Sequence, residues 1–545
     1  MLLRLLKTLR TLSDPLRSGG SAERWILSVP TSDAHAIRRR AVEVVGRFSV
    51  VHRSIGPAQV EALLKVDAWL EPTIAELTRE YAANYEKSSE IELRLWQQAF
   101  DLVKAFAAAY QAALRVGFPR ADDRRWRAVL PWVLVRLAYY KGLDGKFRLF
   151  RYSRWTPAQW REFHELYEFA RMRGWQREQL VLGAATFSRP GVCFEEEYLQ
   201  TLLLMRLDSG NFTADQVQWI AQQLEDWTPA LSLVPPPGDG ATFYVDLTST
   251  QGLRRHDAPP DGGRVLFLDM GPVYTRIIER TRWLPDEGEA KPEAHAAPGE
   301  LPVREQRLLL VRLAALFGPD ALAIAPRAAR YTVDSEVRVV FGLEALCYAI
   351  GETENAGTRR GPGAPADVGP DGVVVPAGGA DLPPSRIGGE VWTMADASET
   401  GCRLTTQMAE SPARLGDLVG IRSNGAWSLG AVRRMQRSEE DDVSLGVEIL
   451  ARRLVPVLLR TWVGSDGDTR PGTGRPFLGI YLPAHPDNRQ SAQRSLIGPP
   501  EQLASGGMAE FDTGKARYLI RFAQVVERQP GWSWALFSAV RSLSA

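Results

Sequence analysis

The spacing of apolar residues changes along the chain, and this change constrains the fold more than any other feature of the sequence. Between about residues 25 and 230, apolar residues recur three and four positions apart, which lines one face of a helix. One such run is Trp96, Ala99, Val103, Phe106 and Tyr110. Thr156-Pro157 marks a helix start, because proline is favoured at the first helical position. From about residue 325, short alternating runs separated by Gly, Asp and Asn indicate β-strands joined by turns.

These patterns predict a multidomain α+β protein with four parts. The parts are a large N-terminal all-α region over 1–233, a small α+β unit over 241–320, an antiparallel β-barrel over 325–463 and a further β-rich C-terminal unit over 475–545. Residues 351–388 contain nine glycines and six prolines. Such a segment buries too little apolar surface to fold, so we expect a disordered insertion inside the barrel.

Charge and cysteine content exclude several classes of protein. Lys and Arg number 66 and Asp and Glu number 65, and a net charge of +1 argues against a protein that binds long polyanions. Cys193, Cys347 and Cys402 lie far apart without a CxxC pair, which argues against a disulfide framework and a structural zinc site. No stretch approaches the roughly 18 uninterrupted apolar residues of a membrane span. We therefore expect a protein of a reducing compartment, the cytoplasm.

The sequence contains no recognisable catalytic or metal-binding constellation. No two of the six histidines have the spacing of metal ligands on one helix. Neither a GxSxG nucleophile elbow nor a GxGxxG dinucleotide loop after a strand occurs. We therefore expect no metal, no cofactor and no enzymatic activity.

Residues 139–155, with the sequence YYKGLDGKFRLFRYSRW, interleave aromatic rings with cations. Stacking rings beside phosphate-pairing cations are typical of proteins that bind single-stranded nucleic acid, so RNA binding is one interpretation. The other is a connection between two helices, whose rings belong to the core and whose cations extend to water. This second interpretation is favoured, and we do not expect nucleic acid as a partner.

A polar motif stands between two expected strands of the barrel. Asp396-Ala397-Ser398-Glu399-Thr400-Gly401 fits the pattern [D/N]xSxxG and lies between EVWTMA and CRLTT. Arg327 and Arg330 precede the first strand, and DLVGIRSNGAWSLGAVRRM and SLGVEIL follow the motif. In this order, over roughly residues 325–463, the features resemble the PilZ domain, a bacterial receptor for cyclic di-GMP.

The resemblance implies a ligand site. In PilZ domains, arginines of an RxxxR stretch reach guanine edges and phosphates, and the [D/N]xSxxG turn wraps the other side of a guanine. The resemblance therefore implies that Arg327, Arg330, Asp396, Ser398 and Gly401 bind cyclic di-GMP. The chemistry suits this role, because a guanidinium donates two parallel hydrogen bonds to a phosphate or to guanine O6 and N7.

Two functions remain open at this point. The first is a cytoplasmic cyclic di-GMP effector that is not an enzyme and that passes ligand binding to a protein partner through the helical region. The second is an interaction scaffold or chaperone-like adaptor whose degenerate barrel binds no nucleotide. The second is open because only two residues separate Arg327 from Arg330, with Pro326 where the first arginine would align. Cys402 also replaces the second glycine often seen after the motif.

Overall fold

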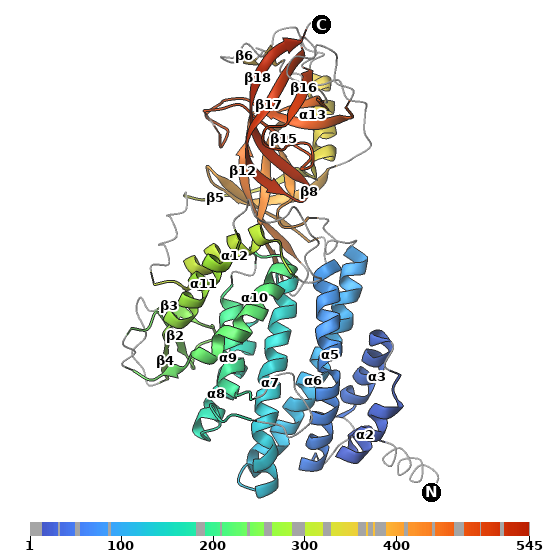
Figure 1. Ribbon diagram of the computed structural model, residues 1–545, viewed down its shortest axis with the longest axis vertical. Helices are drawn as coiled ribbons and strands as arrows, with labels where there is room; N and C mark the ends of the chain where they lie inside the picture. Colours follow the sequence, from blue (N-terminus) through green and yellow to red (C-terminus); the bar gives the residue numbers. More distant parts are fainter. Residues whose placement is uncertain are drawn as a thin grey trace. The chain divides into compact units, whose positions relative to one another are not determined.

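A computed structural model gives the fold (Figure 1). It describes residues 14–30, 33–48, 55–84, 89–180, 191–207, 210–236, 240–255, 264–285, 300–319, 329–357, 367–368, 374–375, 389–407, 413–438, 442–462, 474–490, 492–512 and 517–543. The chain divides after Ala325 into two compact units. The first is mainly helical and the second is built on antiparallel strands, which confirms the predicted α+β class.

Helices make up most of the first unit. They are η1 (Pro15–Arg17), α2 (Gly19–Ser28), α3 (Ala34–Gly46), α5 (Pro57–Asn84), α6 (Ser89–Gly117), η2 (Phe118–Arg120), α7 (Arg124–Phe150), α8 (Pro157–Met172), α9 (Phe194–Arg206), α10 (Ala214–Trp227) and η3 (Thr228–Ala230). Helix α8 begins as its sequence predicts: the Thr156 side chain accepts from the Gln159 backbone N–H, and Pro157 takes the first helical position.

Buried polar side chains join α5, α6 and α7. The Asp67 carboxylate is fully buried and accepts hydrogen bonds from Arg136 Nε and Nη2, both at 2.7 Å. The hydroxyls of Tyr110 and Tyr140 donate to the same carboxylate at 2.5 Å. Burial of a charge is tolerated only when it is paired and hydrogen-bonded, and Asp67 meets both conditions. We call these four residues the Asp67 cluster.

The aromatic residues of the segment 139–155 lie mostly inside this unit. Four of them have at most 6 % of their residue surface exposed: Tyr140, Phe147, Phe150 and Trp155. Arg148 pairs with Asp144 at 3.0 Å, and Arg151 lies 3.5 Å from Glu92. These rings cannot stack on bases, so the hypothesis of RNA binding through this segment loses its physical basis. Most of the segment is the end of α7, not a connection between helices.

A small antiparallel sheet and two helices complete the first unit. Strands β1 (Leu233–Val234), β2 (Phe243–Asp246), β3 (Arg254–Arg255) and β4 (Val265–Leu268) pair in the order β1-β4-β2-β3, and α11 (Gly271–Trp283) and α12 (Val303–Phe317) follow. Their apolar side chains, among them Val245, Leu268 and Ile277, belong to the same buried cluster as the helices. The small unit expected over 241–320 therefore shares one core with the helical region.

Six described strands close the first barrel of the second unit. They are β5 (Tyr331–Phe341), β8 (Glu390–Ala397), β9 (Gly401–Thr406), β10 (Leu418–Ser423), β11 (Ala426–Arg437) and β12 (Val443–Ala451), in the order β10-β11-β12-β9-β8-β5. Asn424 and Gly425 connect β10 to β11 with φ values of 51° and 82°. Two consecutive positive φ values suit the Asn-Gly turn of a tight hairpin.

Helix α13 (Leu343–Gly357) lies between β5 and β8 in the chain. The insertion expected over 351–388 begins later than the sequence indicates, because residues 351–357 continue this helix. Leu346 and Ile350 of the helix are buried, which anchors its earlier turns. Strands β6 (Asp367–Val368) and β7 (Val374–Val375) pair within the insertion, and its other residues lie outside the described ranges.

A second closed barrel follows directly. Its strands are β13 (Val455–Thr461), β14 (Pro476–Leu482), β15 (Ser495–Gly498), β16 (Met508–Asp512), β17 (Arg517–Gln529) and β18 (Trp532–Leu543), in the order β13-β14-β15-β18-β17-β16. The sequence interpretation placed β13 in the first barrel, whereas it is the first strand of the second. Alternation identifies a strand but not the sheet that the strand joins.

The two barrels share a core. Buried side chains of α13, β10 and β11 form one cluster with those of β14, β15 and β18. Trp532 Nε1 donates to the Gly416 carbonyl at 2.9 Å. Arg433 of β11 donates to Glu527 of β17 at 2.5 and 2.7 Å and to Glu448 of β12 at 2.8 Å. Both apolar burial and a charged network therefore hold the barrels together as one unit.

Candidate ligand-binding site

The motif Asp396–Gly401 forms the turn between β8 and β9. The Ser398 backbone N–H donates to the Gly401 carbonyl at 2.7 Å, and the Ser398 hydroxyl donates to the same oxygen at 3.1 Å. Ser398 is buried, with 6 % of its surface exposed. Its hydroxyl proton is used within the turn, so only the lone pairs of its oxygen are left for another partner.

Gly401 allows β9 to approach β12 closely. It pairs with Glu448 at the end of the β9–β12 ladder. A Cβ atom at this position would lie 2.6 Å from the Val447 carbonyl oxygen, which is closer than real Cβ contacts come. Because that oxygen belongs to the backbone of a paired strand, it cannot move away without breaking the pairing of the strands. The glycine of the motif is thus a steric requirement of the barrel.

Arg330 and Asp396 are brought together by the pairing of β5 with β8. Tyr331 pairs with Ala397 and Thr332 with Asp396, so the residue just before β5 lies beside the motif. Arg330 Nη1 donates to Asp396 Oδ1 at 3.1 Å. The structure thus joins Arg330, Asp396, Ser398 and Gly401 in one place. Arg327, the fifth residue of the predicted site, lies outside the described residues.

Two arginines at this turn were not found by sequence reasoning. Arg403 pairs opposite Asp396 across the β8–β9 hairpin, and its Nε lies 2.7 Å from Asp396 Oδ2. Arg452, after β12, donates from Nη2 to the Glu399 carbonyl at 3.2 Å. If residues 398–401 are taken as the turn, counting paired residues outward from it along the two strands places Arg403 opposite Asp396. No local signal marks Arg452, which reaches the motif only through the barrel.

The electrostatics of the site favour an anionic partner. The side chains of Arg330 and Arg403 are 46 % and 50 % exposed, whereas that of Asp396 is 16 % exposed. One shielded carboxylate therefore orients two guanidinium groups that still have donors facing water. Tyr331, next to Arg330, is 62 % exposed and presents an aromatic ring at the same edge. Cations beside an exposed ring suit a ligand with a phosphate and a flat base.

The site carries no evident nucleophile. Burial, and secondarily the charge of Asp396, raises the pKa of the Cys402 thiol to about 12. The thiol is therefore protonated at neutral pH and unreactive. Within the described residues, no group of three or more His, Cys, Asp and Glu side chains could hold a metal ion. The arrangement is suited to binding.

Comparison with known protein families gives a match in the helical unit. Residues 20–237 match the family model of the N-terminal domain of the cyclic di-GMP receptor FimW. The match covers about two fifths of the chain and lies in the helical unit. No curated protein and no solved structure matches the chain. Among the helices of the described residues, none is long and apolar enough to cross a membrane.

Proposed function

We propose that this protein binds cyclic di-GMP through its first barrel, as a PilZ domain, and acts as a non-enzymatic effector. The main observation in support is that residues 20–237 match the N-terminal domain of a cyclic di-GMP receptor. The ligand motif was identified independently in the other unit of the chain, so the two lines of support do not share residues.

The proposed contacts follow from the chemistry of the turn. Arg330 and Arg403 donate pairs of hydrogen bonds to a phosphate or to guanine O6 and N7. The Asp396 carboxylate accepts from the donor edge of a guanine, and the Tyr331 ring stacks on a base. Arg327 joins Arg330 on the same arm of the chain. Cyclic di-GMP carries only two phosphates, so a net chain charge of +1 is compatible with it.

The helical unit is proposed as the part that meets a protein partner. Residues 20–237 of this unit match the N-terminal domain of a cyclic di-GMP receptor, whereas the proposed nucleotide contacts all lie in the other unit. A cytoplasmic location is proposed because Cys193, Cys347 and Cys402 are all free and buried, as in proteins of a reducing compartment.

A thermal-shift titration of the full chain tests ligand binding. A ligand that binds only the folded state stabilises it by about 2.7 kcal/mol at a hundredfold excess over its Kd. We expect cyclic di-GMP to raise the melting temperature in this way. Cyclic di-AMP, which keeps both phosphates but has no guanine edge, should raise it far less. An equal shift with the two nucleotides would show that Asp396 and the arginines do not read guanine.

Arg403→Ala provides the residue-level test. It should weaken cyclic di-GMP binding at least tenfold, the effect of losing one charge-assisted hydrogen bond. Arg517→Ala is the matched control, because its side chain is 45 % exposed and pairs with Asp512 in the second barrel. If both variants bind like the wild type, Arg403 has no place in the site.

A second function is an interaction scaffold that binds no nucleotide. The observation that favours it is the completeness of the turn without a ligand: Asp396 is paired with Arg330 and Arg403, and Ser398 is bonded to Gly401. This function requires no shift of the melting temperature with cyclic di-GMP, together with co-purification of a protein partner. A shift with the nucleotide excludes it.

A further inference from the structure

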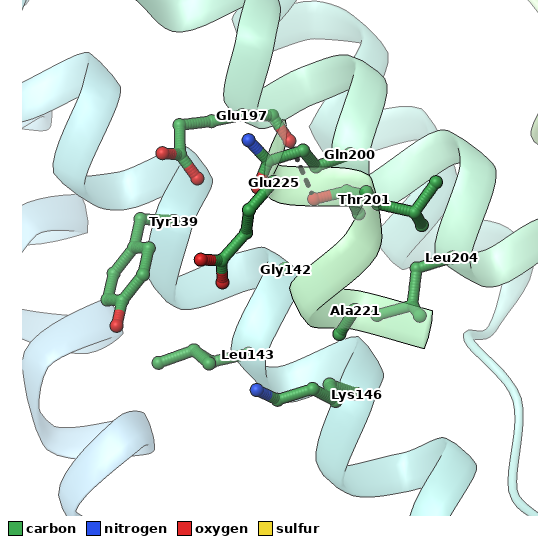
Figure 2. Close-up of a pocket in the computed structure, with 11 residues that line it drawn as sticks. Tyr139, Gly142, Leu143, Lys146, Glu197, Gln200, Thr201, Leu204, Ala221 and Glu225 are labelled. Atoms are coloured by element: carbon green, nitrogen blue, oxygen red, sulfur yellow. Dashed lines mark hydrogen bonds between the residues drawn. The ribbon is translucent and has the colours of Figure 1, made fainter. Parts of the chain in front are cut away.

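A pocket of about 50 Å³ lies between α7, α9 and α10 of the helical unit. Its lining, drawn in Figure 2, consists of Tyr139, Gly142, Leu143, Lys146, Glu197, Gln200, Thr201, Leu204, Ala221, Leu224 and Glu225. All of these residues lie in the part of the chain that matches the receptor domain, and none belongs to the proposed nucleotide site. The pocket combines an aliphatic wall with groups of both charges.

Lys146 supplies the positive charge of the pocket. Its residue surface is only 8 % exposed, although it carries an ammonium group. In the described part of the chain, no hydrogen bond or ion pair forms on this ammonium. Burial lowers the pKa of Lys146, and the charge of Glu225 offsets part of this effect. A buried cation without a hydrogen-bonded counter-ion is costly, and an anionic group placed in the pocket would satisfy it.

Carboxylates supply the negative charge. Glu225 extends from α10 into the space in front of α7, and Glu197 lies on the wall formed by α9 (Figure 2). The amide nitrogen of Gln200 on the same wall is buried and has no hydrogen-bonding partner in the described structure. Because the charge of Glu225 acts on Lys146, a simple anion placed beside Lys146 would be repelled as well as attracted. A small molecule that carries both charges can meet the Lys146 ammonium and the Glu225 carboxylate together.

Glycine in α7 brings the pocket walls close together. A Cβ atom at Gly142 would lie 2.6 Å from Thr201 Oγ1, and one at Gly145 would lie 2.8 Å from Met205 Sδ. Glycine inside a helix is less stable than alanine by about 1 kcal/mol, so these positions need a packing reason. The close approach of α9 to α7 is that reason. It holds Thr201, whose hydroxyl donates to the Glu197 carbonyl, against the pocket.

We propose that this pocket binds a small aliphatic zwitterion, an amino acid of the size of alanine. Its carboxylate meets the Lys146 ammonium, and its ammonium meets the Glu225 carboxylate. A cavity needs roughly 10–15 Å³, measured in the same way, to hold one water molecule. A pocket of about 50 Å³ therefore holds about four waters, or one molecule of similar bulk. Leu143, Leu204, Ala221 and Leu224 leave room for a short apolar side chain.

Calorimetric titration of the full chain with L-alanine tests this proposal. We expect saturable binding of L-alanine and at least tenfold weaker binding of propionate and ethylamine, each of which carries one of its two charges. Absence of saturable L-alanine binding overturns the proposal. Equal binding of propionate or of ethylamine overturns it as well, because the pocket would then not read both charges.

Variants locate the binding. Lys146→Met keeps an unbranched side chain and should weaken L-alanine binding at least tenfold, as should Glu225→Gln. Lys141→Met is the matched control, since Lys141 lies on the same helix but pairs with Glu162 outside the pocket. Lys146→Met should also melt no lower than the wild type, because it removes a buried charge. Wild-type affinity in both Lys146→Met and Glu225→Gln overturns the proposal, whereas cyclic di-GMP binding, which uses the other unit, should be unchanged.

Discussion

Replacing Asp67 with leucine should destabilise the helical unit more than any single change at the surface of the protein. The Asp67 carboxylate is fully buried and accepts four hydrogen bonds of 2.5–2.7 Å. Its loss removes the hydrogen-bonded counter-ion of the Arg136 guanidinium, whose side chain is 5 % exposed and lies 3.8 Å from the Glu71 carboxylate. It also removes the acceptor of the Tyr110 and Tyr140 hydroxyls.

The expected magnitude follows from these contacts. Breaking a buried ion pair by removing one partner costs about 3–5 kcal/mol. Each orphaned hydroxyl adds about 1–3 kcal/mol, less whatever water can restore. Arg136→Met should be milder, because both tyrosine hydroxyls still hydrogen-bond to Asp67. The double variant Asp67→Leu/Arg136→Met should be no worse than Asp67→Leu alone, because it leaves no charge buried without its partner.

Urea unfolding of the full-length wild type, the two single variants and the double variant measures the coupling in this double-mutant cycle. Far-ultraviolet circular dichroism follows the helices, and ten of the sixteen tryptophans precede residue 230, so their fluorescence also reports mainly on this unit. We expect a coupling energy of several kcal/mol between Asp67 and Arg136. If the two single effects add to within about 0.5 kcal/mol, as independent sites do, the reasoning about the Asp67 cluster is refuted.

Two further predictions concern the barrels. Gly401→Ala should lower the melting temperature of the second unit by the equivalent of about 1–3 kcal/mol, because its Cβ would meet the Val447 carbonyl at 2.6 Å; an unchanged temperature would contradict this. Burial opposes ionisation of Glu527, but hydrogen bonds and charge from Arg433 outweigh it and lower the pKa of Glu527 from its ordinary value. The ionised carboxylate therefore stabilises the folded state at neutral pH, and this contribution disappears as pH falls through the lowered pKa. Glu527→Gln should be less stable than the wild type at neutral pH and equal to it in strong acid, as urea midpoints at several pH values would show; a pH-independent difference would contradict the assignment.

The fold class could be predicted because local spacing fixes it. The three-and-four spacing around Trp96 and the Thr156-Pro157 start lie in helices, and the alternating runs after residue 330 lie in strands. Which sheet a strand joins depends on contacts that are distant in sequence. For this reason β13 was placed in the wrong barrel, and the shared core of the first unit was not foreseen.

The candidate site shows the same division. Asp396, Ser398 and Gly401 are close in sequence, and a motif identified them together. Arg403 could have been identified by counting paired residues outward from the turn of the β8–β9 hairpin, which places it opposite Asp396. Arg452 was not, because it approaches the Glu399 carbonyl only when the barrel has closed. The buried charges of α7 carry no sequence signal, since a helical lysine or arginine normally extends to water.

Calorimetric titration of the full chain with cyclic di-GMP tests the central claim most directly. We expect micromolar or tighter binding by the wild type and by the control Arg517→Ala, and at least tenfold weaker binding by Arg330→Ala. The claim is contradicted if the wild type shows no saturable binding, or if it binds cyclic di-GMP no better than Arg330→Ala does.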